Sequence, residues 1–120
     1  MAEPNPEELF NLGMLSYDKQ DFSKARKYFE KACDLNISGG CGALGVLYDD
    51  GEGVEKTQKK AAQFYSKACE LKESFGCGAL GALYYNGDGV KQDSKKAVAL
   101  FKKACKLGYQ LACEMLKELR

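Results

Sequence analysis

Apolar residues recur at spacings of three and four through most of the 120-residue chain, and polar residues fill the positions between them. The stretches "GGCGALGVLY" and "FGCGALGALY" place small and apolar residues at this spacing, which is typical of helices that pack on close neighbours. The stretches "QKKAAQFYSKACEL" and "SKKAVALFKKACKL" place apolar residues on one helix face and lysines on the other. No stretch of useful length alternates with a period of two. The pattern therefore predicts an all-α protein.

We expect seven helices, in two sets that alternate along the chain. The A helices are predicted near residues 6–19, 39–49, 75–86 and 110–119, and the B helices near 22–35, 57–71 and 93–107. The glycines in "DDGEGV" and "NGDGV" are expected to end two of the A helices, because glycine adopts the left-handed conformation of a helix end without steric cost. Thr57 and either Asp93 or Ser94 are the predicted N-caps of the second and third B helices.

The chain repeats itself every 36 residues. Cys33, Cys69 and Cys105 have this spacing, and "CGALGVLYDDGEGV" from residue 41 aligns with "CGALGALYYNGDGV" from residue 77. A period of this length indicates a stack of similar units, each of them one helix pair. We therefore predict a single repeat domain over residues 1–120. Its units are residues 1–36, 37–72 and 73–108, and residues 109–120 form a capping helix.

The pattern A-x-x-x-[FY]-x-K-A-C-x-L-x(5)-C-G-A-L-G-x-L-Y-x(2)-G-x-G-V resembles the Sel-one-like repeat, in the form found in the Helicobacter cysteine-rich protein family. The first unit departs from it: Gly13 and Ala25 are 12 residues apart, whereas Gly45 and Ala61 are 16 apart. That unit lacks a four-residue loop insertion and has the spacing of a tetratricopeptide repeat. Both families stack antiparallel helix pairs, so the resemblance implies a right-handed α/α superhelix of three helix pairs plus a C-terminal capping helix.

Each repeat boundary carries two cysteines eight residues apart. On one continuous helix their Cα atoms would be about 12 Å apart, beyond the roughly 7 Å limit for a disulfide, but a turn between a B helix and the next A helix brings them within range. The repeat register favours the pairs Cys33–Cys41, Cys69–Cys77 and Cys105–Cys113. Buried free thiols and a zinc site are the alternatives, although four-thiolate zinc sites normally use cysteines two to four residues apart, and none exist here. We expect structural disulfides and no metal or other cofactor.

Composition narrows the classes of partner. Lys plus Arg is 18 and Asp plus Glu is 17, so the overall charge predicts neither nucleic-acid nor membrane binding, and we expect a monomer. There is no histidine, which removes the commonest general base and metal ligand. Paired cysteines imply an oxidising location, so we expect a secreted or periplasmic protein whose leader is absent from this sequence.

Charge divides between the two sets of helices. The B segments 23–35, 55–71 and 91–107 hold 14 basic and 5 acidic residues, whereas the rest of the chain is acidic, locally through Glu7, Asp18, Asp49, Asp50 and Asp88. Lysines that merely solvate an outer face would give the same pattern. The alternative is a groove lined by the A helices that attracts a basic peptide. If tetratricopeptide geometry transfers, the groove-facing residues are Phe10, Met14, Tyr17, Asp18, Gly42, Val46, Asp49, Asp50, Gly78, Ala82, Tyr85 and Asn86.

Gly42 and Gly78 would either leave backbone open to a ligand or only permit close helix packing. The aromatic and methionine residues of the groove suit an extended peptide. Our main prediction is therefore a disulfide-stapled scaffold that binds a protein or peptide on its concave A-helix face.

Two further hypotheses concern activity and origin. The resembled family carries a penicillin-binding and β-lactamase label, and Ser16 to Lys19 fits S-x-x-K, but the S-D-N and K-T-G partners are missing; "KTQ" at 56–58 is the nearest approach. A weak β-lactamase is therefore the alternative to a binding scaffold. The likeness of the two "CGAL" units also raises the hypothesis of an engineered or consensus repeat protein with no natural ligand.

Overall fold

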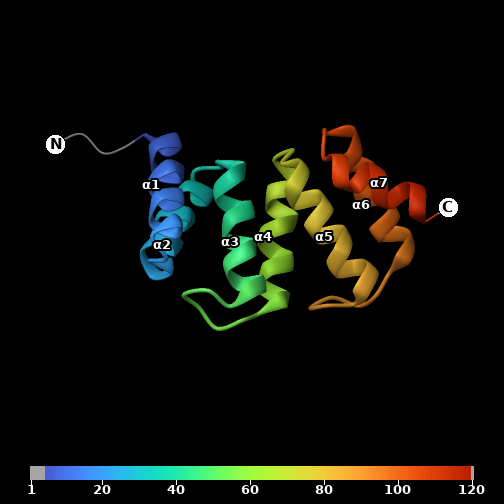
Figure 1. Cartoon of the computed structure of the whole chain (residues 1–120), viewed down its shortest axis with the longest axis horizontal. Coiled ribbons are helices and arrows are strands. Elements are labelled where there is room, and N and C mark those ends of the chain that lie inside the picture. Colours follow the sequence, from blue (N-terminus) through green and yellow to red (C-terminus); the bar gives the residue numbers. More distant parts are fainter. Residues whose placement is uncertain (1–4, 120) are drawn as a thin grey trace.

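The computed structural model describes residues 5–119, which form seven α-helices and no strand (Figure 1). The helices are α1 (Pro6–Asp18), α2 (Phe22–Asp34), α3 (Ser38–Asp50), α4 (Gln58–Glu70), α5 (Ser74–Asn86), α6 (Ser94–Lys106) and α7 (Gln110–Glu118). Every predicted helix is present, and each predicted bound lies within one residue of the observed one. The all-α prediction is confirmed.

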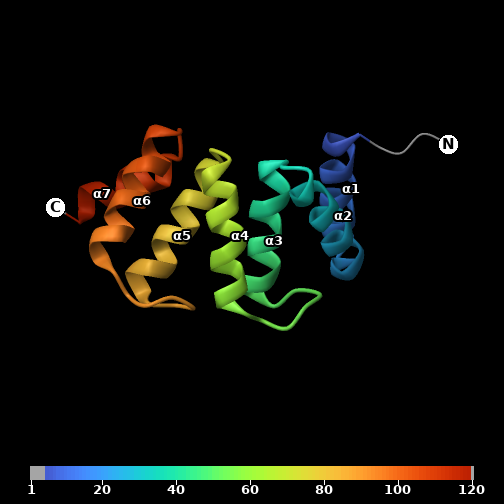
Figure 2. The ribbon, with the colours of Figure 1, turned by 180° about the vertical axis from the view of Figure 1, so that it is seen from behind.

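The helices stack in chain order into an elongated α/α superhelix with principal extents of 54 × 28 × 21 Å. Each helix packs on the next, and α1 also contacts α3, as α3 contacts α5. The two ends of the chain lie at opposite ends of the stack, in the view of Figure 1 and from behind in Figure 2. The A helices α1, α3, α5 and α7 therefore succeed one another along the molecule, and we call the surface they form the A-helix face.

Within each helix pair, an aromatic ring of the B helix packs on a glycine of the A helix. A side chain at any of these three glycines would collide with the ring, so the close approach of the two helices depends on its absence. The pairs are Gly13 with Phe29, Gly45 with Tyr65 and Gly81 with Phe101. All three rings are buried and occupy the centre of their units.

Each B helix is joined to the next A helix by a short turn and a disulfide. The bonds link Cys33 to Cys41, Cys69 to Cys77 and Cys105 to Cys113, with Cα–Cα distances of 4.6, 4.6 and 4.8 Å, which is the pairing that the repeat register favours. No cysteine of the described chain is free. Since every bridge joins adjacent units, the disulfides hold the turns of the stack rather than the interior of a unit.

The link within each pair differs between the first unit and the other two. Residues 19–21 join α1 to α2, whereas residues 51–57 join α3 to α4 and residues 87–93 join α5 to α6. The longer links contain the four additional residues, and Gly51 and Gly87 end their helices in the left-handed conformation as expected. Asp93 caps α6 by accepting a hydrogen bond from the Lys96 backbone N–H at 3.0 Å.

Thr57 is the N-cap residue of α4, as predicted, but its side chain makes no capping hydrogen bond. Its hydroxyl instead donates to the Glu55 carbonyl at 3.2 Å. The longer link therefore uses this hydroxyl to hold its own backbone.

Candidate functional site

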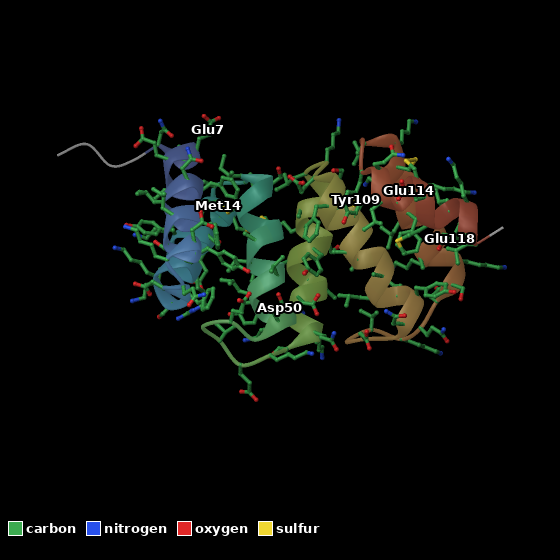
Figure 3. The ribbon with its side chains drawn as sticks, in the orientation of Figure 1. Glu7, Met14, Asp50, Tyr109, Glu114 and Glu118 are labelled. Carbon is green, nitrogen blue, oxygen red and sulfur yellow. A yellow bond between two sulfur atoms is a disulfide. The ribbon has the colours of Figure 1, made fainter. Side chains whose placement is uncertain are left out.

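The residues predicted to face a groove lie on three A helices. Tyr17, Phe10 and Val46 are half-buried, Met14 is 39% exposed and Tyr85 is 40% exposed. Asp18, Asp50 and Asn86 are exposed at the last positions of α1, α3 and α5, and Asp49 and Ala82 are half-buried. Figure 3 shows Met14 between α1 and α3, with Asp50 at the far end of α3.

A first pocket of about 250 Å³ opens between α1 and α3, and we call it the α1/α3 pocket. It is lined by Met14, Tyr17, Phe29, Ala43 and Val46. The structure therefore brings three of the predicted residues, Met14, Tyr17 and Val46, around one hollow. Its floor is the Phe29 ring, which is only 1% exposed. Met14, Ala43 and Val46 contribute apolar side chains to its walls, so the lining is almost wholly apolar.

A second pocket of about 190 Å³, the α5/α7 pocket, occupies the equivalent position two repeats later. It is lined by Tyr85, Phe101, Met115, Glu118 and Leu119. Phe101 follows Phe29 by two 36-residue periods, Met115 follows Ala43, and Glu118 follows Val46. The two hollows are thus built by the same repeat positions, with a carboxylate in the wall of the second where the first has valine.

At the corresponding place between α3 and α5, polar contacts join α3 to α4. The Tyr65 hydroxyl donates to Asp49 Oδ2 at 3.2 Å, and Gln58 Nε2 donates to Asp49 Oδ1 at 3.1 Å. Burial, together with the Asp49 carboxylate, raises the pKa of Tyr65 well above its ordinary value, so this phenol stays protonated. Asp49 lies at a predicted groove position, but its carboxylate is engaged by these two donors.

Acidic groups border the α1/α3 pocket. The Tyr17 hydroxyl, in the pocket wall, donates to Glu52 Oε1 at 3.0 Å. Burial and this hydrogen bond, reinforced by the carboxylates of Glu52, Asp50 and Asp18, raise the pKa of Tyr17. α1, α3 and α5 contain no lysine or arginine at all. The electrostatic potential beside this pocket is therefore negative.

The B helices have the opposite charge. α6 contains five lysines and no acidic residue, and α2 contains four basic residues. Two of the B-helix lysines lie over tyrosine rings of the A helices: Lys96 Nζ is 4.4 Å from the Tyr84 ring centroid, and Lys60 Nζ is 5.4 Å from that of Tyr48. The charge division expected from the sequence thus follows the division between helix sets.

Gly42 and Gly78 are both buried, and for Gly78 the structure favours the packing interpretation. A Cβ on Gly78 would lie 2.5 Å from the ring of Tyr109, which covers this part of α5. A Cβ on Gly42 would meet Glu73 and Phe75 only at ordinary contact distance, 3.8 Å. Close helix packing therefore requires glycine at residue 78 but not at residue 42.

Three acidic residues near this surface were not among the predicted groove residues. Glu114 and Glu118 lie on α7, 36 residues after the predicted positions Gly78 and Ala82. Figure 3 shows both on α7, at the far end of the molecule from Met14. The repeat register contains the signal that identifies them, because α7 is an A helix. Glu52 lies in a link between helices, where helical spacing gives no signal.

Comparison with protein families assigns most of the chain. The Sel1 repeat matches residues 40–73 and 74–109, and the tetratricopeptide repeat matches residues 6–38. The two Sel1 matches together cover more than half of the 120 residues. The chain belongs to the Sel1 repeat family.

Relatives of this Sel1 repeat chain include cysteine-rich proteins of Helicobacter pylori. It is 62% identical to HcpC of strain J99 over 60 residues, or 50% of this chain and 21% of that protein, and 52% identical to HcpA over 60 residues, or 50% and 24%. Both relatives carry beta-lactamase in their names. The chain thus spans about a fifth of the length of these curated relatives.

Solved structures show the same fold. The Helicobacter pylori cysteine-rich protein B superposes with a TM-score of 0.75 at 47% identity, over 82% of this chain and 71% of that one. The protective antigen c5321 of uropathogenic Escherichia coli, described as an SLR fold, superposes with a TM-score of 0.87 at 28% identity, over 93% of this chain and 25% of that one. The two Sel1 matches contain the two longer links.

The S-x-x-K pair of this Sel1 repeat chain lies away from both pockets of the A-helix face. Ser16 is 7% exposed, and its Oγ donates to the Leu12 carbonyl of the same helix at 2.9 Å. Ser16 and Lys19 both line a hollow of about 150 Å³ that also includes Asp21, Lys24 and Tyr28. The serine hydroxyl is thus committed to its own helix, and no hydrogen bond joins it to Lys19 among the described residues.

No group of three or more Cys, Asp or Glu side chains within residues 5–119 has an arrangement that could hold a metal ion. In the same part of the chain, no helix combines the length and the apolar character that a membrane crossing requires.

Proposed function

We propose that the A-helix face binds an extended, basic segment of a protein or peptide. The observation that carries this proposal is the pair of equivalent, largely apolar pockets beside acidic side chains. They lie on a face where α1, α3 and α5 contain no basic residue and α7 contains a single one, Lys117. Apolar hollows at repeat spacing suit alternate side chains of an extended chain, and the acidic surroundings favour lysine and arginine among them.

The place of action is inferred from the disulfides. Three bridges that close short turns persist only where thiols are oxidised, so we infer an extracytoplasmic location. A partner would then be another exported or surface protein, encountered without the reducing pool of the cytosol.

Hydrolysis of a β-lactam is suggested by the names of HcpA and HcpC, and we rank it second. A serine nucleophile needs a base that accepts its proton, whereas the Ser16 hydroxyl donates to the Leu12 carbonyl. Turnover of a chromogenic β-lactam by the wild type, lost in Ser16→Ala, would reverse this ranking.

Selection of random twelve-residue peptides displayed on phage against the immobilised chain tests the binding proposal. We expect the selected peptides to be enriched in lysine and arginine beside large apolar residues, and their affinity to fall as salt rises. Enrichment of acidic peptides, or none of any kind, contradicts the proposal.

A matched pair of double variants then places the binding site. Asp18→Lys with Asp50→Lys reverses charge at the last residues of α1 and α3, and Asp34→Lys with Glu70→Lys does so at the last residues of α2 and α4. All four side chains are exposed. We expect the first variant to weaken binding of a selected peptide about tenfold and the second less than twofold. Equal losses would mean that only net charge matters.

A further inference from the structure

The spacing of the two pockets limits what can occupy both. The α1/α3 and α5/α7 pockets are related by two repeats, and α1–α3 and α3–α5 are contacting neighbours. Neighbouring packed helices lie about 8–10 Å apart, so the pockets are separated by about 20 Å. An extended chain advances about 3.3 Å per residue, and about six residues therefore span them.

The two pockets differ in the side chain that they suit. The α1/α3 pocket offers Met14, Val46 and the Phe29 ring, with no charged group in its lining. It suits a leucine, methionine or phenylalanine side chain, because an apolar side chain has no hydrogen bond to water to lose when it is buried in this pocket.

The α5/α7 pocket suits a lysine or arginine side chain. Its apolar walls, Tyr85 and Met115, can cover the methylene stem, while the Glu118 carboxylate can accept a hydrogen bond from the charged head. Glu118 is exposed, so an apolar side chain there would leave the carboxylate to water and gain no charged hydrogen bond from it.

In the repeat between these pockets, a polar contact takes the place of an apolar anchor site. The equivalent position is occupied by Asp49, whose two oxygens already accept from Tyr65 and Gln58. The residues of a bound segment that lie over α3 and α5 are therefore free to vary, apart from being small enough to pass Val46 and Ala82.

We propose that the ligand of this chain is an extended segment with two anchors, a large apolar residue in the α1/α3 pocket and a lysine or arginine about six residues away in the α5/α7 pocket. This inference rests on the proposed function. It adds the spacing between the two anchor residues and the kind of side chain that each pocket binds.

The test uses labelled peptides that hold one leucine and one lysine in a glycine-serine background, with the separation varied from three to nine residues and in both orders. Fluorescence anisotropy with the whole chain gives the dissociation constants. We expect the tightest binding at a separation of about six, at least tenfold tighter than at three. Binding that is independent of separation overturns the two-anchor proposal but leaves the proposed function standing. If the peptides selected from phage do not bind either, the proposed function itself has failed.

Substitutions at equivalent wall positions separate the two anchors. Glu118→Gln should weaken the best peptide about fivefold, but should not weaken the same peptide with norleucine in place of lysine. Glu70→Gln, the same change at an exposed position of the B helix α4, is the control and should alter neither. Equal effects of the two changes overturn the assignment of lysine to the α5/α7 pocket.

Val46→Glu provides the converse test, because it gives the α1/α3 pocket the carboxylate that the other pocket has. We expect a peptide with two lysines to gain affinity at least threefold over the leucine–lysine peptide in this variant. Circular dichroism confirms that each variant is folded. An unchanged preference for leucine in folded Val46→Glu overturns the assignment of the apolar anchor.

Discussion

The α4–α5 boundary and the α6–α7 boundary contain equivalent disulfides, but the cysteines of the two bonds differ in burial. Cys69 of α4 and Cys77 of α5 are buried, because α3 packs on α4 and α6 packs on α5. Cys105 and Cys113 are only half-buried, because α7 is the last helix of the described stack. The disulfide therefore forms at every repeat boundary, whereas its burial depends on the units that pack on either side.

The two boundaries also differ at one residue that faces the previous A helix. Glu73 and Tyr109 occupy equivalent positions just before α5 and α7. The Tyr109 ring covers Gly78 and makes an edge contact with Phe75 at a centroid distance of 6.0 Å. The last boundary has fewer neighbouring units to cover it, and there an aromatic ring stands where the internal boundary has a carboxylate.

Removal of the disulfides should show the largest difference. We expect Cys69→Ala with Cys77→Ala to lower the free energy of unfolding by about 3–5 kcal/mol, because it removes both a cross-link and buried sulfur contacts. Cys105→Ala with Cys113→Ala should cost about 2 kcal/mol, since that pair is half-buried. Urea unfolding followed by circular dichroism measures both. Equal costs would mean that burial adds nothing to the cross-link.

Alanine at the two equivalent glycines should change stability in opposite directions. Gly42→Ala has room for its methyl group and should stabilise by about 0.5–1 kcal/mol, because alanine favours a helix over glycine. Gly78→Ala should destabilise by about 1–2 kcal/mol, since the Tyr109 ring must move. Thermal melts of both variants supply the comparison.

A double variant provides the control. Tyr109→Glu gives the last boundary the residue found at the internal one, so it should abolish the cost of Gly78→Ala. A cost that persists in the double variant would place the steric conflict elsewhere.

Tyr65 should make the internal unit sensitive to alkaline pH, and its counterpart Phe101 cannot. The pKa of Tyr65 is raised in the folded chain, so its contribution to stability is complete below the unfolded-state value near 10 and is lost as pH rises above that value. We expect a loss of about 1 kcal/mol near pH 10.7 in the wild type that Tyr65→Phe does not show. Urea midpoints of both proteins at pH 8 and pH 10.7 measure it. Parallel pH profiles would exclude Tyr65 as the cause.

The smallest structural effect should follow from mild reduction. We expect the Cys105–Cys113 bond to be reduced first, because these two cysteines are half-buried whereas the other four are buried. The loss of helix should be limited to the nine residues of α7. Timed alkylation and peptide mass mapping identify the order. Simultaneous reduction of all three bonds would indicate global unfolding instead.

The helices were predictable because each carries its own apolar pattern, and because glycines end α3 and α5. The disulfide pairing was predictable because the 36-residue register repeats it. The pockets were not predictable from the sequence, because a pocket depends on which ring lies beneath two A helices. Phe29 leaves a hollow, whereas the hydroxyl of Tyr65 makes a polar contact with Asp49. The binding roles of all the predicted groove residues remain predictions, because neither exposure nor a hollow identifies a ligand.

The longer links within the Sel1 units have a consequence for how such chains evolve. Gly53 and Gly89 approach the first residues of the preceding B helix, and what they meet is chiefly main chain, that of Phe22 and of Gln58. Positive φ angles of 71° and 72° and the missing side chain make that approach feasible. This one contact between neighbouring units therefore depends on the main chain of a helix start and hardly on its side chains, so at this point a duplicated unit fits its neighbour whatever residue begins the B helix.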